Sequence, residues 1–138
     1  MTAAEIYQEM MALPIDEKRS LLASIHKAFT EEVKRQQDIA DDEWGRRLLD
    51  ISASAMNVDS IGDSRSRIDT FGRTMVAYEL RREGYSLAHI GELLHRDHST
   101  VMWMLNRMKN VLDFPRSYRE EATYWNNFNT LLTNEIDR

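Results

Sequence analysis

Apolar residues recur at helical spacing along almost the whole chain. Ile6, Met10 and Leu13 stand at i, i+4 and i+7, which predicts a first helix that stops near Pro14. Pro14 suits the opening turn of a second helix. The apolar face of this second helix comprises Leu21, Leu22, Ile25 and Phe29. The pattern therefore predicts an N-terminal helical hairpin over residues 3–36, with no chemistry that we can infer from its residues.

A change of composition follows this hairpin. Residues 37–42 are polar and acidic, and we expect them to link two parts of the chain. A third helix is then predicted from an apolar face formed by Trp44, Leu48, Ile51 and Ala55. Asn57, Gly62 and the D-S-R-S-R segment after Gly62 predict a loop.

The remaining pattern predicts four more helices. Asp69 or Thr70 is expected to cap a helix that ends at Gly84, where a left-handed residue suits the terminus. Ser86 is expected to cap a short helix over residues 87–94, and a three-residue turn leads to a helix of about fourteen residues that Pro115 breaks. The last helix, over residues 118–132, has a buried stripe of Tyr124, Trp125, Phe128 and Leu132. We predict an all-α chain with two domains, residues 1–42 and 43–138.

The composition argues against disulfide-bonded, zinc-thiolate and membrane-spanning proteins. The chain has 138 residues, only five glycines and two prolines, and no cysteine, which excludes disulfides and thiolate zinc sites. No apolar run approaches the roughly 20 residues that span a bilayer, and the polar N-terminus does not resemble a signal peptide. We therefore expect a cytoplasmic protein without a membrane partner.

Charge is distributed unevenly along the chain. The net charge is −5, but residues 65–119 carry ten Lys and Arg against six Asp and Glu, whereas residues 1–64 carry seven against thirteen. A positive segment inside an acidic chain is typical of a nucleic-acid site, although arginines that merely solvate helix faces would give the same counts. Charge alone does not decide between the two interpretations.

The segment S-L-A-H-I-G-E-L-L-H-R-D-H-S-T-V predicts a helix-turn-helix. Apolar spacing places three residues of its first helix and four of its second toward the core: Leu87, Ile90 and Leu94, then Val101, Leu105, Met108 and Leu112. Gly91 allows a close approach of the second helix. The outer face of that helix would then carry His98, Ser99, Met102, Trp103 and Asn106, whose polar members are suited to base edges.

The longer stretch from Gly72 to Val101 resembles the signature of the C-terminal DNA-binding domain of the bacterial replication initiator DnaA. The resemblance lies in an arginine at the head of a helix, S-L-x-x-I-G, and the closing R-D-H-S-T-V, and it covers about residues 43–132. It implies a DnaA-type, Trp-repressor-like helix-turn-helix that binds double-stranded DNA in replication initiation or transcription regulation. We expect no enzymatic activity and no cofactor, because the sequence has no phosphate loop, metal cluster or nucleophile constellation.

The resemblance also implies roles for individual residues. Asp97, His98, Ser99 and Thr100 match the family's major-groove readers, and Arg65 matches a basic-loop arginine that enters the minor groove. Arg73 matches an arginine that contacts phosphate, and Arg81 or Arg82 falls near another basic contact. The remaining residues expected at the DNA interface are Arg67, Thr74, Leu87, Arg96 and Trp103.

Several positions depart from the family pattern. A single His95 replaces the usual two glycines, Thr74 replaces a glutamine, Trp103 stands where a histidine is common, and Asp63 and Asp69 flank the basic loop. Each departure touches recognition, so the family's DNA sequence is not assumed for this chain. The chain also has no G-x-x-x-x-G-K-[ST] phosphate loop, so no ATPase activity is expected.

Two other chemistries are conceivable from the residue types, catalysis by a triad and metal binding. Asp97, His98 and Ser99 are the residue types of a catalytic triad, but three consecutive residues point in different directions and cannot form the relay. His89 and His95 could ligate a metal with a carboxylate, but we expect surface or packing roles and no metal. The alternative function is a protein-interaction module, in which residues 3–36 bind a partner or dimerise and the helix-turn-helix is a scaffold.

Overall fold

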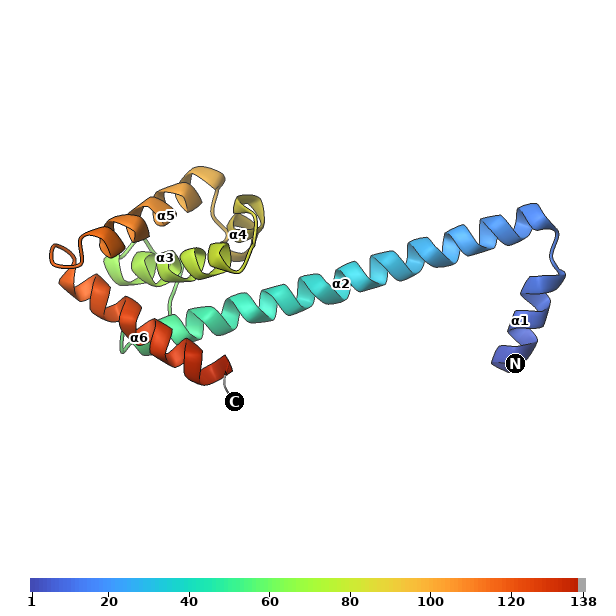
Figure 1. The fold of residues 1–138 in the computed structure, drawn as a ribbon, viewed down its shortest axis with the longest axis horizontal. Coiled ribbons are helices and arrows are strands. Elements are labelled where there is room, and N and C mark those ends of the chain that lie inside the picture. Colours follow the sequence, from blue (N-terminus) through green and yellow to red (C-terminus); the bar gives the residue numbers. More distant parts are fainter. Residues whose placement is uncertain (137–138) are drawn as a thin grey trace. The chain divides into compact units, whose positions relative to one another are not determined.

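The computed structural model describes residues 1–136, and within them the chain is all-helical (Figure 1). This confirms the predicted fold class. The chain divides into two compact units, Met1–Ala40 and Asp41–Arg138. The predicted boundary stood two residues further along, between 42 and 43.

The N-terminal unit contains α1 (Ala3–Ala12) and the first part of α2 (Ile15–Ala55). Thr2 and Glu5 form a reciprocal capping box at the start of α1. None of the side chains of α1 is buried, and the buried residues of α2 begin only at Asp41. The apolar face predicted for the second helix is therefore largely exposed to solvent rather than packed in a core.

The predicted link at residues 37–42 contains the boundary between the two units, but the expected break between two helices is wrong, because α2 continues through the segment. No glycine or proline occurs between Pro14 and Gly45, so nothing in this segment interrupts the backbone hydrogen bonds. Asp41 also has a structural role, since it is buried and accepts a hydrogen bond from the hydroxyl of Tyr85. The acidic residues of this segment thus lie on the polar surface of a helix, apart from Asp41, which is the buried hydrogen-bond partner of Tyr85.

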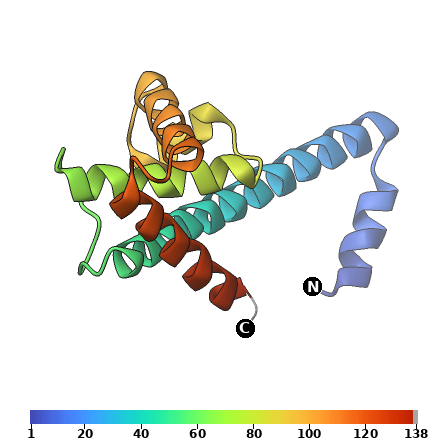
Figure 2. The same cartoon turned by 60° about the vertical axis from the view of Figure 1, so that its left-hand side comes forward.

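The second unit is built around α3 (Arg67–Arg82), which contacts α4 (Leu87–Leu94), α5 (His98–Asp113) and α6 (Arg119–Ile136). In both views α4 and α5 lie on one side of α3, and α6 and the end of α2 lie on the other (Figures 1 and 2). The largest fully buried side chains of this core come from all five helices and include Leu48, Met75, Leu80, Ile90, Met104, Met108 and Phe128.

The predicted helix ends and core positions are mostly confirmed. Ser86 caps α4, and Gly84 adopts φ +101° after α3. Two details are wrong. Ser66, rather than Asp69 or Thr70, caps α3 by accepting a hydrogen bond from the backbone of Asp69. Leu112 is exposed, and Val111 takes its place in the core.

None of the helices in the described part of the chain is both long and apolar enough to cross a membrane.

Candidate nucleic-acid interface

The turn between α4 and α5 brings the two helices of the predicted helix-turn-helix together. His95 ends α4 in the left-handed conformation, at φ 55° and ψ 46°, where glycine is the usual residue. The next backbone N–H, of Arg96, donates to the carbonyl of Gly91 at 2.9 Å. A Cβ atom built on Gly91 would lie 2.6 Å from the carbonyl oxygen of Arg96, so the turn needs a glycine at this position. The close approach predicted at Gly91 is thus made by the turn itself.

Asp97 begins α5 as its N-cap. Its carboxylate accepts a hydrogen bond from the backbone N–H of Thr100 at 2.8 Å, and this bond lowers the pKa of the Asp97 carboxyl. The side chain remains exposed at the end of the helix. Asp97 was predicted to read bases, which stays a prediction; in the structure its carboxylate caps the N-terminus of α5.

The outward face of α5 carries the side chains that the spacing placed there. His98, Ser99, Met102, Trp103 and Asn106 are all exposed. Trp103 is 54% exposed and Met102 41%, so two large apolar side chains stand among the polar ones. Opposite them, Val101, Met104 and Met108 lie in the core and hold the helix on α3.

The loop of residues 57–66 lies beside α5 and is held from below by Arg73. This arginine is only 4% exposed, and its guanidinium donates to the carbonyls of Gly62 and Ser64, the latter at 2.8 Å. Burial and the charge of Arg96 lower the pKa of Arg73, although the group remains cationic. Arg73 was predicted to contact phosphate. Its guanidinium is buried and its hydrogen bonds go to the loop, and the residue also lines the groove between the loop and α5, so the phosphate contact stays a prediction.

Two further side chains fix the same loop. The carboxylate of Asp69 accepts from the N–H of Gly62 at 3.0 Å and from the hydroxyl of Ser64 at 2.5 Å, which lowers its pKa. Arg96 donates to the carbonyl of Asp63 at 2.8 Å. A loop of mostly polar residues is therefore held in place by three charged side chains, those of Arg73, Asp69 and Arg96.

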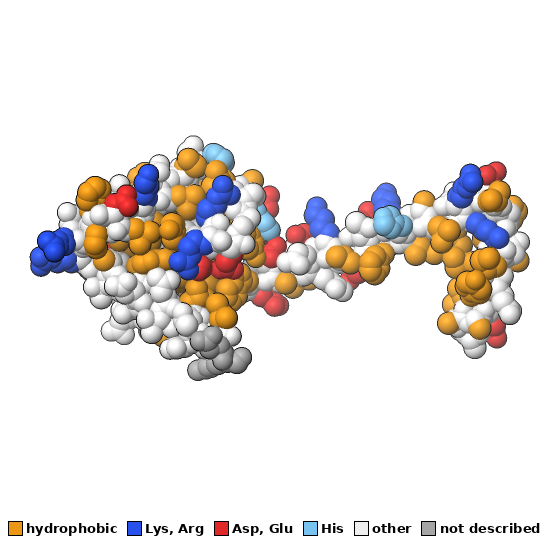
Figure 3. Space-filling model, in the orientation of Figure 1, with side chains coloured by type: hydrophobic (Ala, Val, Ile, Leu, Met, Phe, Trp, Pro, Cys, Tyr) orange, Lys and Arg blue, Asp and Glu red, His pale blue; other side chains and the backbone are white. Residues whose placement is uncertain are grey.

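Arg65 stands at the exposed end of this loop. Within residues 1–136 it makes no hydrogen bond or ion pair, unlike Arg73 and Arg96. Two adjoining grooves, of about 590 and 420 Å³, lie between the loop and α5, and both are lined by Arg65, Thr70 and Trp103. Thr100 lines the first groove and Arg107 the second. Figure 3 shows Lys and Arg side chains interspersed with apolar ones over this unit.

The other predicted interface arginines make contacts within the protein, and Arg67 also lines the second groove. Arg67 pairs with Glu121 at 2.8 Å and with Glu120 at 3.4 Å. Arg81 donates to the carbonyl of Tyr85, and Arg82 pairs with Glu79 at 2.6 Å. Thr74 is fully buried with its hydroxyl bonded to the carbonyl of Thr70, so its predicted contact with DNA is corrected. Leu87 packs against the core but is only partly buried, so its place at the interface stays a prediction.

Arg107 lines the groove but was not predicted. Its guanidinium lies 4.5 Å from the ring centroid of Tyr118 and 3.6 Å from a carboxylate oxygen of Glu121. It stands four residues after Trp103, on the same face of α5, so helical spacing would have identified it.

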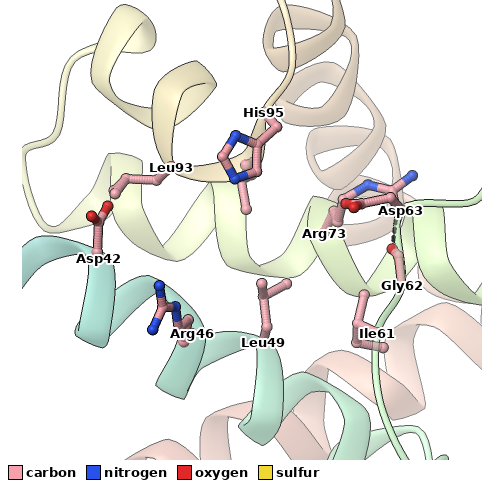
Figure 4. Close-up of a pocket in the computed structure, with 10 residues that line it drawn as sticks. Asp42, Arg46, Leu49, Ile61, Gly62, Asp63, Arg73, Leu93 and His95 are labelled. Carbon is pink, nitrogen blue, oxygen red and sulfur yellow. Dashed lines mark hydrogen bonds between the residues drawn. The ribbon is translucent and has the colours of Figure 1, made fainter.

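A smaller cavity of about 190 Å³ lies behind the loop (Figure 4). Asp42 and Arg46 of α2 line it together with His95 and Arg73, so its charges are mixed. Arg46 was also missing from the predicted residues, because the pattern offered no way to place α2 beside the turn. Among residues 1–136, no three His, Asp or Glu side chains are grouped so that they could hold a metal ion.

Comparison with protein-family models, curated proteins and solved structures finds no match for this chain. The interface is therefore interpreted from its own geometry and chemistry.

Proposed function

We propose that the chain binds double-stranded DNA in a sequence-preferring way, with α5 in the major groove. Two exposed features carry the proposal: the outer face of α5, with polar and apolar side chains, and Arg65 at the edge of the same groove, which makes no ion pair within residues 1–136. An α-helix fits the major groove of B-DNA, and its N-terminal residues then reach the base edges.

The side chains on α5 have the chemistry that base recognition needs. His98 and Ser99 each supply hydrogen-bond donors and acceptors near the N-terminus of the helix. Met102 and Trp103 offer apolar contact of the kind that the methyl group of thymine accepts. We propose that His98 and Ser99 read base edges and that Asp97 and Thr100 position the helix start.

The arginines divide into two groups under this proposal. Arg65, which is exposed, enters the adjacent minor groove or meets the phosphates. Arg73 and Arg96 hold the loop that presents it. The likeness of R-D-H-S-T-V to the DnaA signature supports DNA as the ligand and regulation of replication or transcription as the setting. The proposed activity is binding without catalysis and without a cofactor.

The test is selection from a random-sequence duplex library with the whole chain at two salt concentrations. We expect an enriched motif, and we expect the His98→Ala/Ser99→Ala variant to lose the enrichment while it keeps weak, salt-sensitive binding. The matched control is Asn126→Ala/Thr133→Ala, which removes two exposed polar side chains from α6 and should leave the motif unchanged. If the wild-type chain enriched no sequence, the proposal would be wrong.

A second candidate function is protein binding by the N-terminal unit, with the helix-turn-helix as scaffold. It is favoured by the exposed apolar side chains along α1 and α2, which extend from Ile6 to Phe29 and beyond. The selection experiment distinguishes the two functions, because a chain whose helix-turn-helix serves only as a scaffold would enrich no DNA motif. They can also coexist in one chain, since they use different surfaces.

A further inference from the structure

The N-terminal unit exposes an apolar stripe that no part of the unit covers. Leu22, Ile25, Phe29 and Val33 stand at i, i+3, i+7 and i+11 of α2, so they share one face of the helix, and Ile15 falls on the same face seven residues earlier. All five are exposed, and Phe29 is 68% exposed. We call these five residues the α2 stripe.

A groove opens beside the start of this stripe, where α1 and α2 meet. It has a volume of about 140 Å³ and is lined by Tyr7, Met10, Met11, Lys18, Leu21 and Leu22. Every lining side chain except Lys18 offers apolar surface. Figure 3 shows apolar side chains gathered both at this junction and along α2. The unit thus presents a protruding aromatic side chain, Phe29, and an apolar recess two turns away, at Leu22.

The charges beside the stripe change sign along the helix. Lys18 and Arg19 flank its N-terminal end, and Glu32 flanks its C-terminal end. In a parallel pair of such helices, like charges would face each other at both ends. In an antiparallel pair about an axis between Ile25 and His26, Arg19 faces Glu32 of the other copy. Glu32 also pairs with Arg35 at 2.6 Å, but both side chains are solvent-exposed, and such a pair is easily exchanged.

The same antiparallel register also places the protruding Phe29 of one copy opposite the groove of the other. Residue numbers that face each other across this axis add to a constant, so Leu22 lies opposite Phe29 of the second copy. Each Phe29 then reaches the groove beside Leu22 of the other chain. We propose that a second copy of this chain covers the α2 stripe, in an antiparallel arrangement that places Phe29 of each copy in the α1–α2 groove of the other.

The size of the exposed surface fits this occupant. Nine large apolar side chains of the unit, excluding Met1, are between 47% and 68% exposed: Ile6, Tyr7, Met11, Ile15, Leu22, Ile25, Phe29, Val33 and Ile39. Contiguous apolar patches beyond a few hundred Å² are rare on monomers. Stable interfaces bury about 800 Å² on each partner, a scale that nine such side chains and their polar rim can supply.

Sedimentation of the purified whole chain tests the association. We expect a species of twice the 16.2 kDa chain mass that dissociates on dilution. Phe29→Glu should weaken the dimer by roughly 100-fold, the effect of losing a buried aromatic anchor. Ser24→Glu adds the same charge on the exposed opposite side of α2 and should leave the dimer intact. Circular dichroism should give equal helix content for both variants, because neither position is buried. A wild-type chain that stays monomeric at all concentrations overturns the proposal.

Disulfide trapping tests the orientation of the two helices. The chain has no native cysteine, so only the introduced cysteines can cross-link. We expect a mixture of Leu22→Cys and Phe29→Cys chains to form a mixed disulfide on mild oxidation, because a disulfide requires Cα atoms within about 7 Å. Neither variant alone should cross-link efficiently. Efficient cross-linking of the Leu22→Cys chain with itself would mean a parallel pair and would overturn the antiparallel arrangement.

This association is independent of DNA binding. Phe29→Glu should leave the selected DNA motif unchanged, since the α2 stripe lies outside the helix-turn-helix. The two proposals can therefore fail separately.

Discussion

The guanidinium of Arg96 donates to the carbonyl oxygen of Asp63, with the nitrogen 2.8 Å from that oxygen. Arg96 lies in the turn between α4 and α5, and Asp63 lies in the 57–66 loop, 33 positions earlier in the chain. Arg73 holds the neighbouring carbonyls of Gly62 and Ser64. The position of Arg65 beside α5 therefore depends on two arginines that act through the backbone of the loop.

Arg96→Ala should weaken DNA binding mainly by releasing the loop that carries Arg65. We expect a loss of roughly tenfold, about 1.4 kcal/mol, in affinity for the selected duplex. If Arg96 acts through the loop, its effect should nearly vanish in a chain that already carries Arg65→Ala. A double-mutant cycle of affinities measures this coupling. Fully additive losses would mean that Arg96 contacts DNA independently of the loop.

Arg73→Met should lower the stability of the second unit. It leaves the carbonyls of Gly62 and Ser64 without their donor, and we expect a cost of about 2–3 kcal/mol in the free energy of unfolding. Urea denaturation followed by tryptophan fluorescence measures it, because all three tryptophans lie in residues 41–138. Arg65→Met is the matched control and should stay within about 0.5 kcal/mol of wild type. Equal losses in the two variants would contradict the structural role assigned to Arg73.

The sequence predicts where most helices lie better than it predicts which of their residues are buried in tertiary contacts. Caps and breakers such as Ser86, Gly84 and Pro115 are local signals, so the helix ends in the second unit follow from neighbouring residues. The continuity of α2 across residues 37–42 was missed, because acidic residues indicate solvent exposure whether the backbone is a loop or a helix. One of these acidic residues, Asp41, is in fact buried, and its hydrogen-bond partner Tyr85 is 44 residues away, so no local pattern could reveal its role.

The candidate interface was predictable only in part. The outer face of α5 follows from helical periodicity, and its five residues are exposed as expected. The role of an arginine does not follow from periodicity. Arg73 and Arg65 both fit a basic DNA-binding residue in sequence, yet Arg73 is buried under the loop and Arg65 is exposed at its edge. Burial depends on how the loop folds back over α3, which is a long-range feature.

Gly91→Ala should destabilise the packing of α4 against α5. The added Cβ would lie 2.6 Å from the carbonyl oxygen of Arg96, a backbone atom that cannot rotate away. We expect a loss of at least about 2 kcal/mol in unfolding free energy. Gly45→Ala is the control, because its Cβ would approach Leu93 at an ordinary 3.9 Å. That change should stabilise α2 by about 0.5–1 kcal/mol, the helix preference of alanine over glycine. Equal effects of the two substitutions in urea denaturation would contradict the close approach at the turn.

Trp103 should report DNA binding directly. It is half exposed on α5, whereas Trp125 is 5% exposed and Trp44 donates to Glu83 at 2.7 Å. Acrylamide should therefore quench mainly Trp103 in the free protein, and Trp103→Phe should remove most of that quenching. Addition of the selected duplex should protect the wild-type fluorescence. Unchanged quenching on saturation with DNA would place the interface away from α5.

The stability of the second unit should fall in acid through Asp97 and Asp69. The pKa of Asp97 is lowered by its hydrogen bond from Thr100, and that of Asp69 by its bonds from Ser64 and Gly62. A carboxyl whose pKa is lowered on folding stabilises the protein above its unfolded pKa of about 3.9. This contribution is lost as pH falls through the lower, folded pKa.

Asp97→Asn separates the cap from its charge, because asparagine caps helices about as well as aspartate but does not titrate. At pH 7 the urea midpoint of this variant should stay close to that of wild type. Between about pH 5 and 2 its midpoint should fall less steeply than the wild-type midpoint, since one linked proton has been removed. If Asp97→Asn instead followed the wild-type curve, the N-cap carboxylate would carry no part of the acid sensitivity, and the loss would have to arise at Asp69 and the loop that it holds.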